Sequence, residues 1–276
     1  MNGPFGALPP SPFQERMRAI GHRLGADYWG RRAASLLLGP AGGRDKRAYD
    51  VAVFGSQKAR LHPYDNICEK RVYLTPQLWD GEERARLGDF IAAREGGDFI
   101  FVDVGANAGL YTLFARAEAM RSGLRFRGLC VEADPDMAAR LEFNLSASGA
   151  LKDVALFNCA ASSAEGTLRF TVEKKSRGLS RVDPQGAAAV RARTLHSMAA
   201  AAGFDRIDAM KIDIEGHELP ALSAFFASAP AALYPRLLML EISHEAENAS
   251  ALKLAIEIGY QAMLRTKRNA VLVRAS

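Results

Sequence analysis

Cysteine is scarce in this sequence. Three cysteines, Cys68, Cys130 and Cys159, are spread over 276 residues, and no two of them form a CxxC pair. Cys130 and Cys159 fall in apolar, strand-like runs, where a reduced and buried thiol is the ordinary expectation. The sequence therefore favours a reducing compartment, and we expect a cytoplasmic protein.

Long apolar runs and targeting features are also missing. No segment approaches about 18 uninterrupted apolar residues, so a membrane-spanning helix is not expected. The start of the chain, MNGPFGALPPSPFQERMR, lacks the basic start, apolar run and cleavage site of a secretory signal. Charge is nearly balanced, with 36 Lys and Arg against 31 Asp and Glu, and much of the small excess lies in the first 60 residues. We therefore expect no nucleic-acid partner.

The chain does contain enough apolar material, 49% of its residues, for a full α/β core. We predict a small N-terminal arm and helical cap over residues 1–80 and a main domain over 81–276. Within the cap, 51–80 contains two strand-like pieces, VAVFG and RVYLT. The arginine-rich, helix-like pattern at 13–38 indicates a helix packed on the domain, which we favour. The alternative is an amphipathic helix that makes peripheral contact with an anionic membrane or with a partner.

From residue 98 onward, strand-like and helix-like segments alternate, which predicts a doubly wound, mostly parallel sheet with helices on both faces. An antiparallel hairpin of YQAMLR and AVLVRA is expected to close one edge of this sheet. Residues 165–194 break the alternation and predict an inserted β-hairpin with the basic tip EKKSRG. The parallel strands are expected at 98–104, 124–132, 154–162, 208–214 and 236–242.

The stretch 98–113, DFIFVDVGANAGLYTL, organises the rest of the chain. It is an apolar strand that stops at a glycine loop and restarts as a helix near Leu110. Glycines let a ligand approach the backbone, and the helix start offers unpaired N–H groups. The stretch therefore predicts a site for an adenosine-type cofactor, approached through Gly105 and Gly109.

Polar side chains stand where the predicted strands end. Because parallel strands present their carboxyl ends at one edge of the sheet, we expect these side chains to gather around a ligand there. They are Asp103, Glu132, Asn158, Asp213, Glu215, Glu241 and His244.

Each of these side chains has a structural alternative. Asp103 either caps the turn or supports the ligand, and Asn158 either lies near an adenine ring or serves a turn. Glu132 is favoured as the acceptor for both ribose hydroxyls, over a surface salt bridge. Asp134 is expected to cap the helix that starts at Pro135.

Asn107 discriminates between cofactors. A dinucleotide fingerprint requires glycine at this position, so that the pyrophosphate can approach the backbone. A cofactor with an amino-acid tail tolerates the Asn107 amide and can use it. Together with Glu132, the loop predicts S-adenosylmethionine rather than a nicotinamide.

Four motifs carry a family resemblance: DVGANAGLYT (103–112), VEADP (131–135), MKIDIEGHELPAL (210–222) and LEIS (240–243). They resemble the FkbM family of S-adenosylmethionine-dependent methyltransferases. The resemblance implies the Rossmann-like class I methyltransferase fold and methyl transfer to a hydroxyl, usually of a sugar or polyketide. Many members read TLD after the inserted hairpin, where this chain has Thr194, Leu195 and His196.

By position, the resemblance implies two groups of site residues. One group, Asp103, Gly105, Asn107 and Gly109, would line the methionine tail of the cofactor, and Glu132 would hold its ribose. The other, Asp213, Glu215 and His217, would face the methyl group and the acceptor.

A hydroxyl must lose its proton as it is methylated, which calls for a positioned base or a metal. We expect Asp213 or His217 to take that proton, with Asp213 favoured, while Glu215 is as well explained by the helix N-terminus. A metal held by Asp213, Glu241 and His244 is disfavoured, because no tight ligand spacing is visible.

The expected acceptor is a small molecule or a sugar, glycan or glycolipid. The basic tip, with Lys174, Lys175 and Arg177, either grips an anionic acceptor or is simply solvated. Two other classes stay open, a nicotinamide-dependent oxidoreductase and a non-catalytic cofactor-binding protein of the same fold.

Overall fold

The structure is a computed structural model that describes residues 3–173, 180–243 and 250–274. Its centre is a seven-stranded sheet in the order β12-β13-β11-β10-β3-β4-β5. The five strands from β11 to β5 are parallel, and β12 and β13 add an antiparallel hairpin at one edge. This confirms the predicted doubly wound sheet and its terminal hairpin. The strands are β3 (Asp98–Val104), β4 (Arg125–Val131), β5 (Val154–Phe157), β10 (Ala209–Ile212), β11 (Leu237–Glu241), β12 (Tyr260–Arg265) and β13 (Asn269–Arg274).

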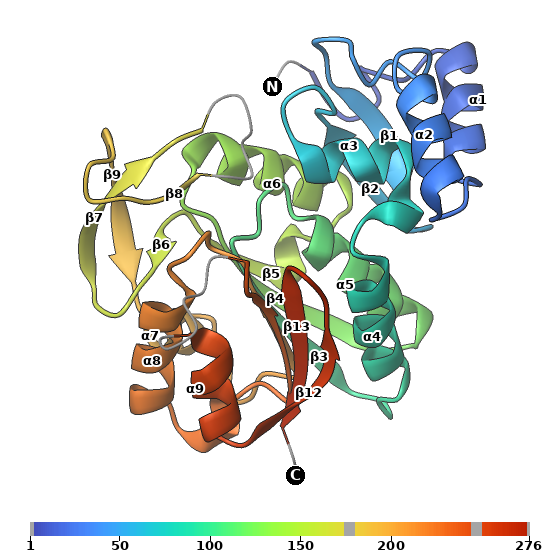
Figure 1. Ribbon diagram of the computed structural model, residues 1–276. Coiled ribbons are helices and arrows are strands. Elements are labelled where there is room, and N and C mark those ends of the chain that lie inside the picture. The colour runs from blue at the N-terminus through green and yellow to red at the C-terminus, as the bar shows by residue number, and fades with distance from the viewer. Residues whose placement is uncertain (1–2, 174–179, 244–249, 275–276) are drawn as a thin grey trace.

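Helices cover both faces of this sheet (Figure 1). Side chains of β3 alternate between two cores, with Phe99 and Phe101 in one and Ile100 and Val102 in the other. The first core is completed by α4 (Gly81–Ala92), α5 (Leu110–Arg121) and α6 (Pro135–Ala147). The second is completed by α7 (Leu195–Ala201), α8 (Glu218–Ser228) and α9 (Ala251–Glu257).

A second, four-stranded sheet is inserted after β5 and lies at the left of Figure 1. The predicted hairpin is confirmed by the antiparallel pairing of β7 with β9. The third parallel strand is shorter than predicted, because the chain leaves the central sheet after Phe157 and Ala160–Ala161 joins the small one. The residues of the basic tip, Lys174, Lys175 and Arg177, lie outside the described residues. The small sheet contains β6 (Ala160–Ala161), β7 (Gly166–Thr171), β8 (Arg181–Val182) and β9 (Ala188–Arg193).

The N-terminal cap packs on α6 and α5 through β2. Its arginine-rich part forms two helices rather than one, because Asp27 caps a new helix start and accepts a hydrogen bond from Gly30 N. The cap consists of α1 (Pro12–Gly21), α2 (Tyr28–Leu37), β1 (Tyr49–Val53), β2 (Gln57–Leu61) and α3 (Ile67–Leu74).

One strand-like piece of the cap was predicted wrongly. RVYLT belongs largely to α3, whose start is fixed by the Asn66 side chain accepting hydrogen bonds from Cys68 N and Glu69 N. A β-branched and aromatic run of this length favours a strand locally, and the cap and tertiary packing override that preference. The predicted boundary between residues 80 and 81 stays a prediction.

Candidate active site

The strand order reverses between β3 and β10, and a cavity opens at the carboxyl ends of these strands, where open α/β sheets bind ligands. Two loops of the main domain line it where the ends of β3 and β10 meet. They are the loop after β3, with Gly105, Ala106 and Asn107, and the loop after β10, with Asp213, Ile214 and Glu215. Asp103, Glu132 and Glu241 also line it, as predicted from their places at strand ends.

Gly105 is the point where the two strand ends touch. Its φ is +77°, and a Cβ at this position would lie 1.9 Å from the carbonyl oxygen of Asp213. Gly109 has a structural role instead. It is the N-cap of α5 with a φ of +81°, and a Cβ there would lie 2.5 Å from Leu141 Cδ1. Gly105 lines the cavity and Gly109 lies outside its lining.

Asp103 is almost fully buried beneath the loop, with 1% of its surface exposed. Its Oδ2 accepts hydrogen bonds from Thr112 N at 3.1 Å and Thr112 Oγ1 at 2.7 Å. Within the described part of the chain no donor reaches Oδ1. Burial raises the pKa of the Asp103 carboxyl, against the lowering effect of the Lys211 charge. An acceptor oxygen left in this state suits a cationic amino group, such as that of the methionine tail.

Glu132 is held by two backbone donors. Its Oε2 accepts from Asn107 N at 2.7 Å and its Oε1 from Asp134 N at 2.8 Å. The side chain is 8% exposed, so it is not part of a surface salt bridge. Burial raises the pKa of Glu132 to about 7, because desolvation outweighs these two hydrogen bonds. Hydroxyl donors from a ribose would supply the solvation that this carboxylate lacks.

Asn107 links this carboxylate to the cap. The residue has a φ of +53°, and its Oδ1 accepts hydrogen bonds from Ala108 N at 2.9 Å and from Asn66 Nδ2 at 2.6 Å. The N-cap residue of α3 therefore supports the cofactor loop directly.

Asn158 and Asp134 serve local structure. Asn158 Nδ2 donates to the carbonyl of Glu132 at 2.8 Å, and the residue lies outside the cavity lining. That geometry favours the turn role over the adenine role. Asp134 caps α6 as predicted, with its side chain accepting from Asp136 N at 2.9 Å.

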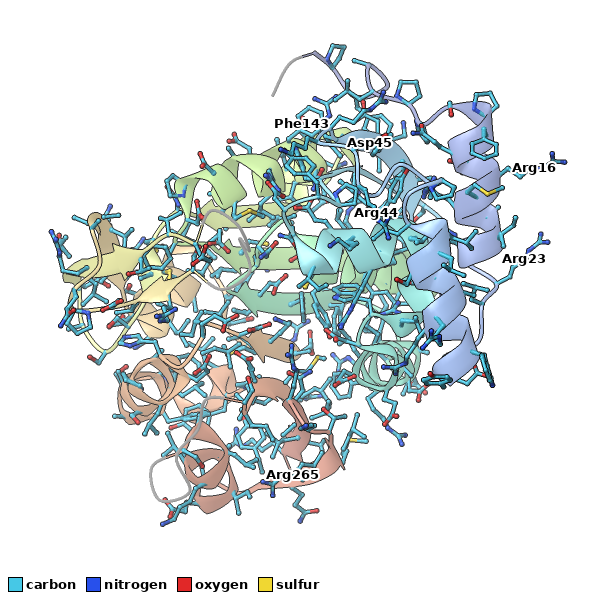
Figure 2. All side chains as sticks on the ribbon, turned by 45° about the horizontal axis from the view of Figure 1, so that its top comes forward. Arg16, Arg23, Arg44, Asp45, Phe143 and Arg265 are labelled. Atoms are coloured by element: carbon cyan, nitrogen blue, oxygen red, sulfur yellow. The ribbon has the colours of Figure 1, made fainter. Side chains whose placement is uncertain are left out.

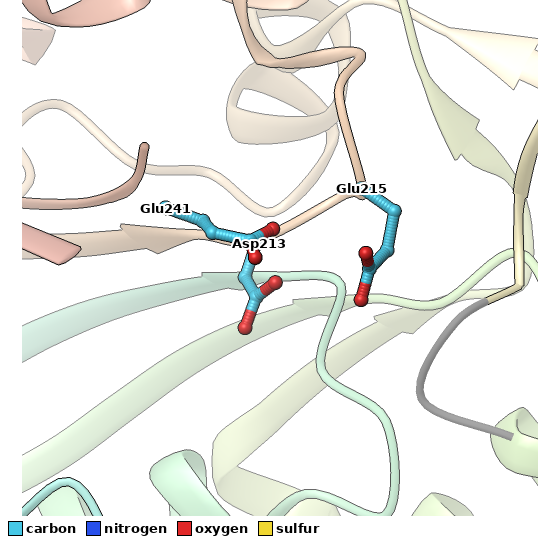
Figure 3. A group of neighbouring side chains, drawn as sticks. All are labelled: Asp213, Glu215 and Glu241. Carbon is cyan, nitrogen blue, oxygen red and sulfur yellow. The ribbon is translucent and has the colours of Figure 1, made fainter. Parts of the chain in front are cut away.

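An acidic cluster stands at the ends of β10 and β11. One carboxylate oxygen from each of Asp213, Glu215 and Glu241 lies within 4.8 Å of the others, and all three residues are partly buried (Figure 3). The Lys211 ammonium binds Asp213 Oδ2 at 2.7 Å. Burial lowers the pKa of Lys211, but Asp213 and Asp103 outweigh it and raise the pKa overall. Burial and the Asp213 charge raise the pKa of Glu241 to about 8.

One predicted member of this group is not found with it. His217 Nε2 contacts Ser162 Oγ at 3.0 Å, and the ring lies outside the cavity lining. Glu215 and Gly216 both have positive φ, at +54° and +96°, and this turn directs the histidine away from Asp213. The predicted convergence of Asp213 and His217 is therefore wrong. His244 lies outside the described residues. Among the residues that the structure describes, Glu215 stands beside Asp213 and Glu241.

The cap contributes more to the cavity than the sequence indicated. Tyr111 Oη donates to Asp80 Oδ2 at 3.0 Å, and Lys211 Nζ lies 4.9 Å from the Tyr111 ring centroid. Asn66 is a typical helix N-cap residue, and it was the sequence feature from which α3, and so part of this wall, could have been predicted. The contributing cap residues are Ile67, Cys68, Arg71, Trp79 and Asp80.

The segment that departs from the family pattern stands apart from this cavity. Thr194 caps α7 by accepting a hydrogen bond from Ser197 N at 3.2 Å. Thr194, Leu195 and His196 all lie outside the cavity lining.

The sheet order and the glycine loop at its switch point are those of the Rossmann-like fold of class I methyltransferases. Residues 103–258 match the methyltransferase FkbM domain. This match covers more than half of the chain, which therefore belongs to the FkbM family of methyltransferases, and its cofactor is S-adenosylmethionine. Family membership sets the nicotinamide alternative aside.

Several solved structures are similar in fold. A methyltransferase FkbM from Methylobacillus flagellatus KT is 16% identical with a TM-score of 0.46, and the match covers 94% of this chain and 57% of that one. The METTL16 methyltransferase domain is 12% identical with a TM-score of 0.49, over 94% of this chain and 88% of that one. A SAM-dependent O-methyltransferase from Thermotoga maritima is 12% identical with a TM-score of 0.41, over 71% and 65%. The chain thus spans little more than half of the FkbM structure. No curated protein matches the sequence.

Among the described residues, no helix combines the length and the apolar character that crossing a bilayer requires.

Proposed function

We propose that this chain is an O-methyltransferase that transfers the methyl group of S-adenosylmethionine to a hydroxyl of a sugar, glycan or glycolipid. The observation that carries the proposal is the cluster of Asp213, Glu215 and Glu241 at the edge of the cofactor loop. A neutral hydroxyl is a poor nucleophile and needs a proton acceptor beside it. The other carboxyl groups of the lining are already engaged, Asp80 by Tyr111, Asp103 by Thr112 and Glu132 by two backbone N–H groups.

Residues of β3, β4 and their loops suit the cofactor. When bound, S-adenosylmethionine would supply a sulfonium-bound methyl carbon that is open to in-line attack by an acceptor oxygen, with S-adenosylhomocysteine as the leaving group. Asp103 Oδ1 would accept from the amino group of the tail, and Glu132 would accept from the ribose hydroxyls. Gly105 lines the cavity and lets the loop approach the end of β10. The Asn107 loop is already held by Glu132 and Asn66.

Asp213 is our choice for the group that takes the proton. Its pairing with the Lys211 ammonium keeps it as a carboxylate and fixes its position at the strand end. With a pKa of about 8, Glu241 holds a proton at neutral pH and provides the neutral partner beside Asp213.

The same cluster favours a polyhydroxylated acceptor. Carboxylates only accept hydrogen bonds, so Asp213 and Glu215 are matched by a molecule that presents several hydroxyl donors close together, and the protonated Glu241 can donate one hydrogen bond to it. Arg71, Arg268 and Asn269 line the cavity as well and offer donors for ring or glycosidic oxygens. Such an arrangement of acceptors and donors suits a sugar better than an apolar alcohol.

The test is an acceptor screen with radiolabelled methyl donor across sugars, glycolipids and polyketides, followed by variants on the best acceptor. Asp213→Asn should lower kcat by about 100-fold or more while S-adenosylhomocysteine affinity, measured by calorimetry, stays within about threefold. His217→Ala is the matched control and should change kcat by less than about threefold, because the ring lies outside the cavity. Label appearing on nitrogen or carbon, or an Asp213→Asn variant of full activity, would overturn the proposal. Cofactor binding without turnover of any acceptor would favour the non-catalytic alternative.

A further inference from the structure

The net charge of the chain is concentrated in one short segment. Residues 12–47 hold eight Lys and Arg and three Asp and Glu, an excess of five, and the whole chain has a net charge of +5. The remaining 240 residues are therefore neutral, with 28 basic and 28 acidic side chains. This segment is α1, α2 and the loop that follows them.

The same helices expose an unusual share of large apolar side chains. In the described part of the chain, eleven such side chains are exposed, and five of them lie on α1 and α2. Trp29 is 74% exposed and Leu36 is 79% exposed. We call these five, together with the neighbouring arginines, the α1–α2 surface. It comprises Phe13, Ile20, Tyr28, Trp29 and Leu36 with Arg16, Arg23, Arg31 and Arg32.

The apolar and basic side chains alternate on one side of each helix. Phe13, Arg16 and Ile20 share a face of α1, at spacings of three and four residues. Trp29, Arg32 and Leu36 repeat that pattern on α2. Figure 2 shows Arg16 and Arg23 pointing away from the body of the molecule.

The opposite sides of both helices are anchored, that of α2 by Leu37, which is partly buried against the first core. Arg18 is buried and donates to the Tyr73 carbonyl at 3.0 Å, which ties α1 to α3. Gly21 packs so closely on Leu74 that a Cβ there would lie 2.5 Å from its carbonyl oxygen. The exposed side chains of the α1–α2 surface are therefore presented on a fixed support and are not the frayed side of a loose helix.

We propose that the α1–α2 surface docks this enzyme on an anionic phospholipid bilayer. Arginines flanking Trp, Phe and Leu on a short helix are the pattern of interfacial binding, in which the apolar side chains enter the headgroup boundary and the arginines meet lipid phosphates. A nucleic acid would satisfy the arginines and stack on Trp29, but it would leave Ile20 and Leu36 exposed to water. The inference is independent of the proposed acceptor, because it concerns binding and not turnover.

Vesicle co-sedimentation of the full chain tests the proposal. Vesicles of phosphatidylcholine with about a third phosphatidylglycerol are compared with phosphatidylcholine alone, at low and at high salt. The charge variant is Arg16→Glu with Arg23→Glu, and the apolar variant is Trp29→Ser with Leu36→Ser. The matched controls are Arg265→Glu and Ile256→Ser, which change exposed side chains on β12 and α9.

We expect salt-sensitive pelleting with the anionic vesicles. Each arginine near an anionic surface strengthens partitioning about fivefold, so the charge variant should bind at least about 25-fold more weakly. The apolar variant should bind at least about tenfold more weakly, and both controls should bind like the parent. Unchanged thermal unfolding and S-adenosylhomocysteine affinity would show that the variants are folded.

Three results would overturn the proposal. One is pelleting with anionic vesicles no greater than with phosphatidylcholine, and another is binding that both variants retain. The third is a protein that does not bind vesicles but uses the α1–α2 surface for another partner. That partner would be a second copy, seen as a dimer by light scattering, or single-stranded RNA, seen as a mobility shift in a gel. In that case the exposed side chains serve another partner.

Discussion

Replacing Gly105 by alanine tests how tightly the two halves of the sheet meet at the cofactor loop. The new Cβ would lie 1.9 Å from the Asp213 carbonyl oxygen, where ordinary contact begins at 3.4 Å. About 1.5 Å must therefore be gained by moving one strand end away from the other. Because the obstacle is backbone, no side-chain rotation relieves it. The end of β10, with its carboxylates, is the part that must move.

The loss of stability expected for Gly105→Ala has a backbone contribution and a steric contribution, and a second glycine with a similar φ separates the two. Gly97 has a φ of +79°, close to the +77° of Gly105, and a Cβ there would have nothing within 4 Å. Gly97→Ala should therefore cost only the left-handed backbone term, about 1 kcal/mol. Gly105→Ala adds the steric term and should cost about 3 kcal/mol or more, which lowers the Tm by about 10 °C.

Function should separate the two variants more sharply than stability does. A displacement of about 1 Å at a reacting group can reduce a rate about 100-fold. We therefore expect Gly105→Ala to lose S-adenosylhomocysteine affinity in calorimetry and about 100-fold in kcat, while Gly97→Ala retains both. If the two variants unfold at the same temperature and bind the product equally well, the contact between Gly105 and Asp213 is not what shapes the site.

Three further predictions concern the loop and its supports. As Glu132 has a pKa of about 7, raised above its unfolded value near 4.5, its contribution to unfolding free energy is present below pH 4.5 and is lost as the pH rises through 7. Affinity for S-adenosylhomocysteine should show the opposite trend, strengthening up to about tenfold per pH unit towards pH 7, and Glu132→Gln should flatten both profiles in thermal melts and calorimetry. Asp103→Asn should weaken that affinity about tenfold or more by removing the charge that meets the amino group, with little loss of Tm; equal affinities would rule this contact out. Asn66→Ala should cost about 1 kcal/mol and weaken product binding, whereas Ser11→Ala, which removes the α1 cap, should lower stability alone.

Local patterns in the sequence were sufficient to predict the central sheet and many of the site residues at the carboxyl ends of its strands. The run from Phe99 to Val104 is buried on both sides, so strand, loop and helix could be read without knowledge of distant contacts. Asp103, Glu132 and Asp213 were placed because the carboxyl ends of parallel strands meet by topology. The hydrogen-bond partners of these carboxyl groups could not be predicted in the same way, because a hydrogen bond depends on the direction of each side chain.

Long-range packing accounts for what was missed. The wall supplied by Cys68 and Trp79 comes from the cap. The cap residue Asn66 could have shown locally where α3 starts, but not that α3 packs beside the cofactor loop. His217 is four residues from Asp213, which on a regular helix would bring the two together. Positive φ at Glu215 and Gly216 breaks that regularity, and a non-glycine residue in this conformation could not be foreseen from propensity.

The hydrogen bond between Asn66 and Asn107 couples the local unfolding of the cap to that of the glycine loop. It continues through Asn107 N to Glu132, and from Glu132 to Asp134 at the start of α6. Two helix starts and the glycine loop therefore belong to one cooperative opening unit. Amide hydrogens in α3 should exchange with solvent more slowly when the product is bound, although α3 is remote in sequence from the loop. Binding in the pocket would then slow the local unfolding of α3, the helix to which α1 is anchored.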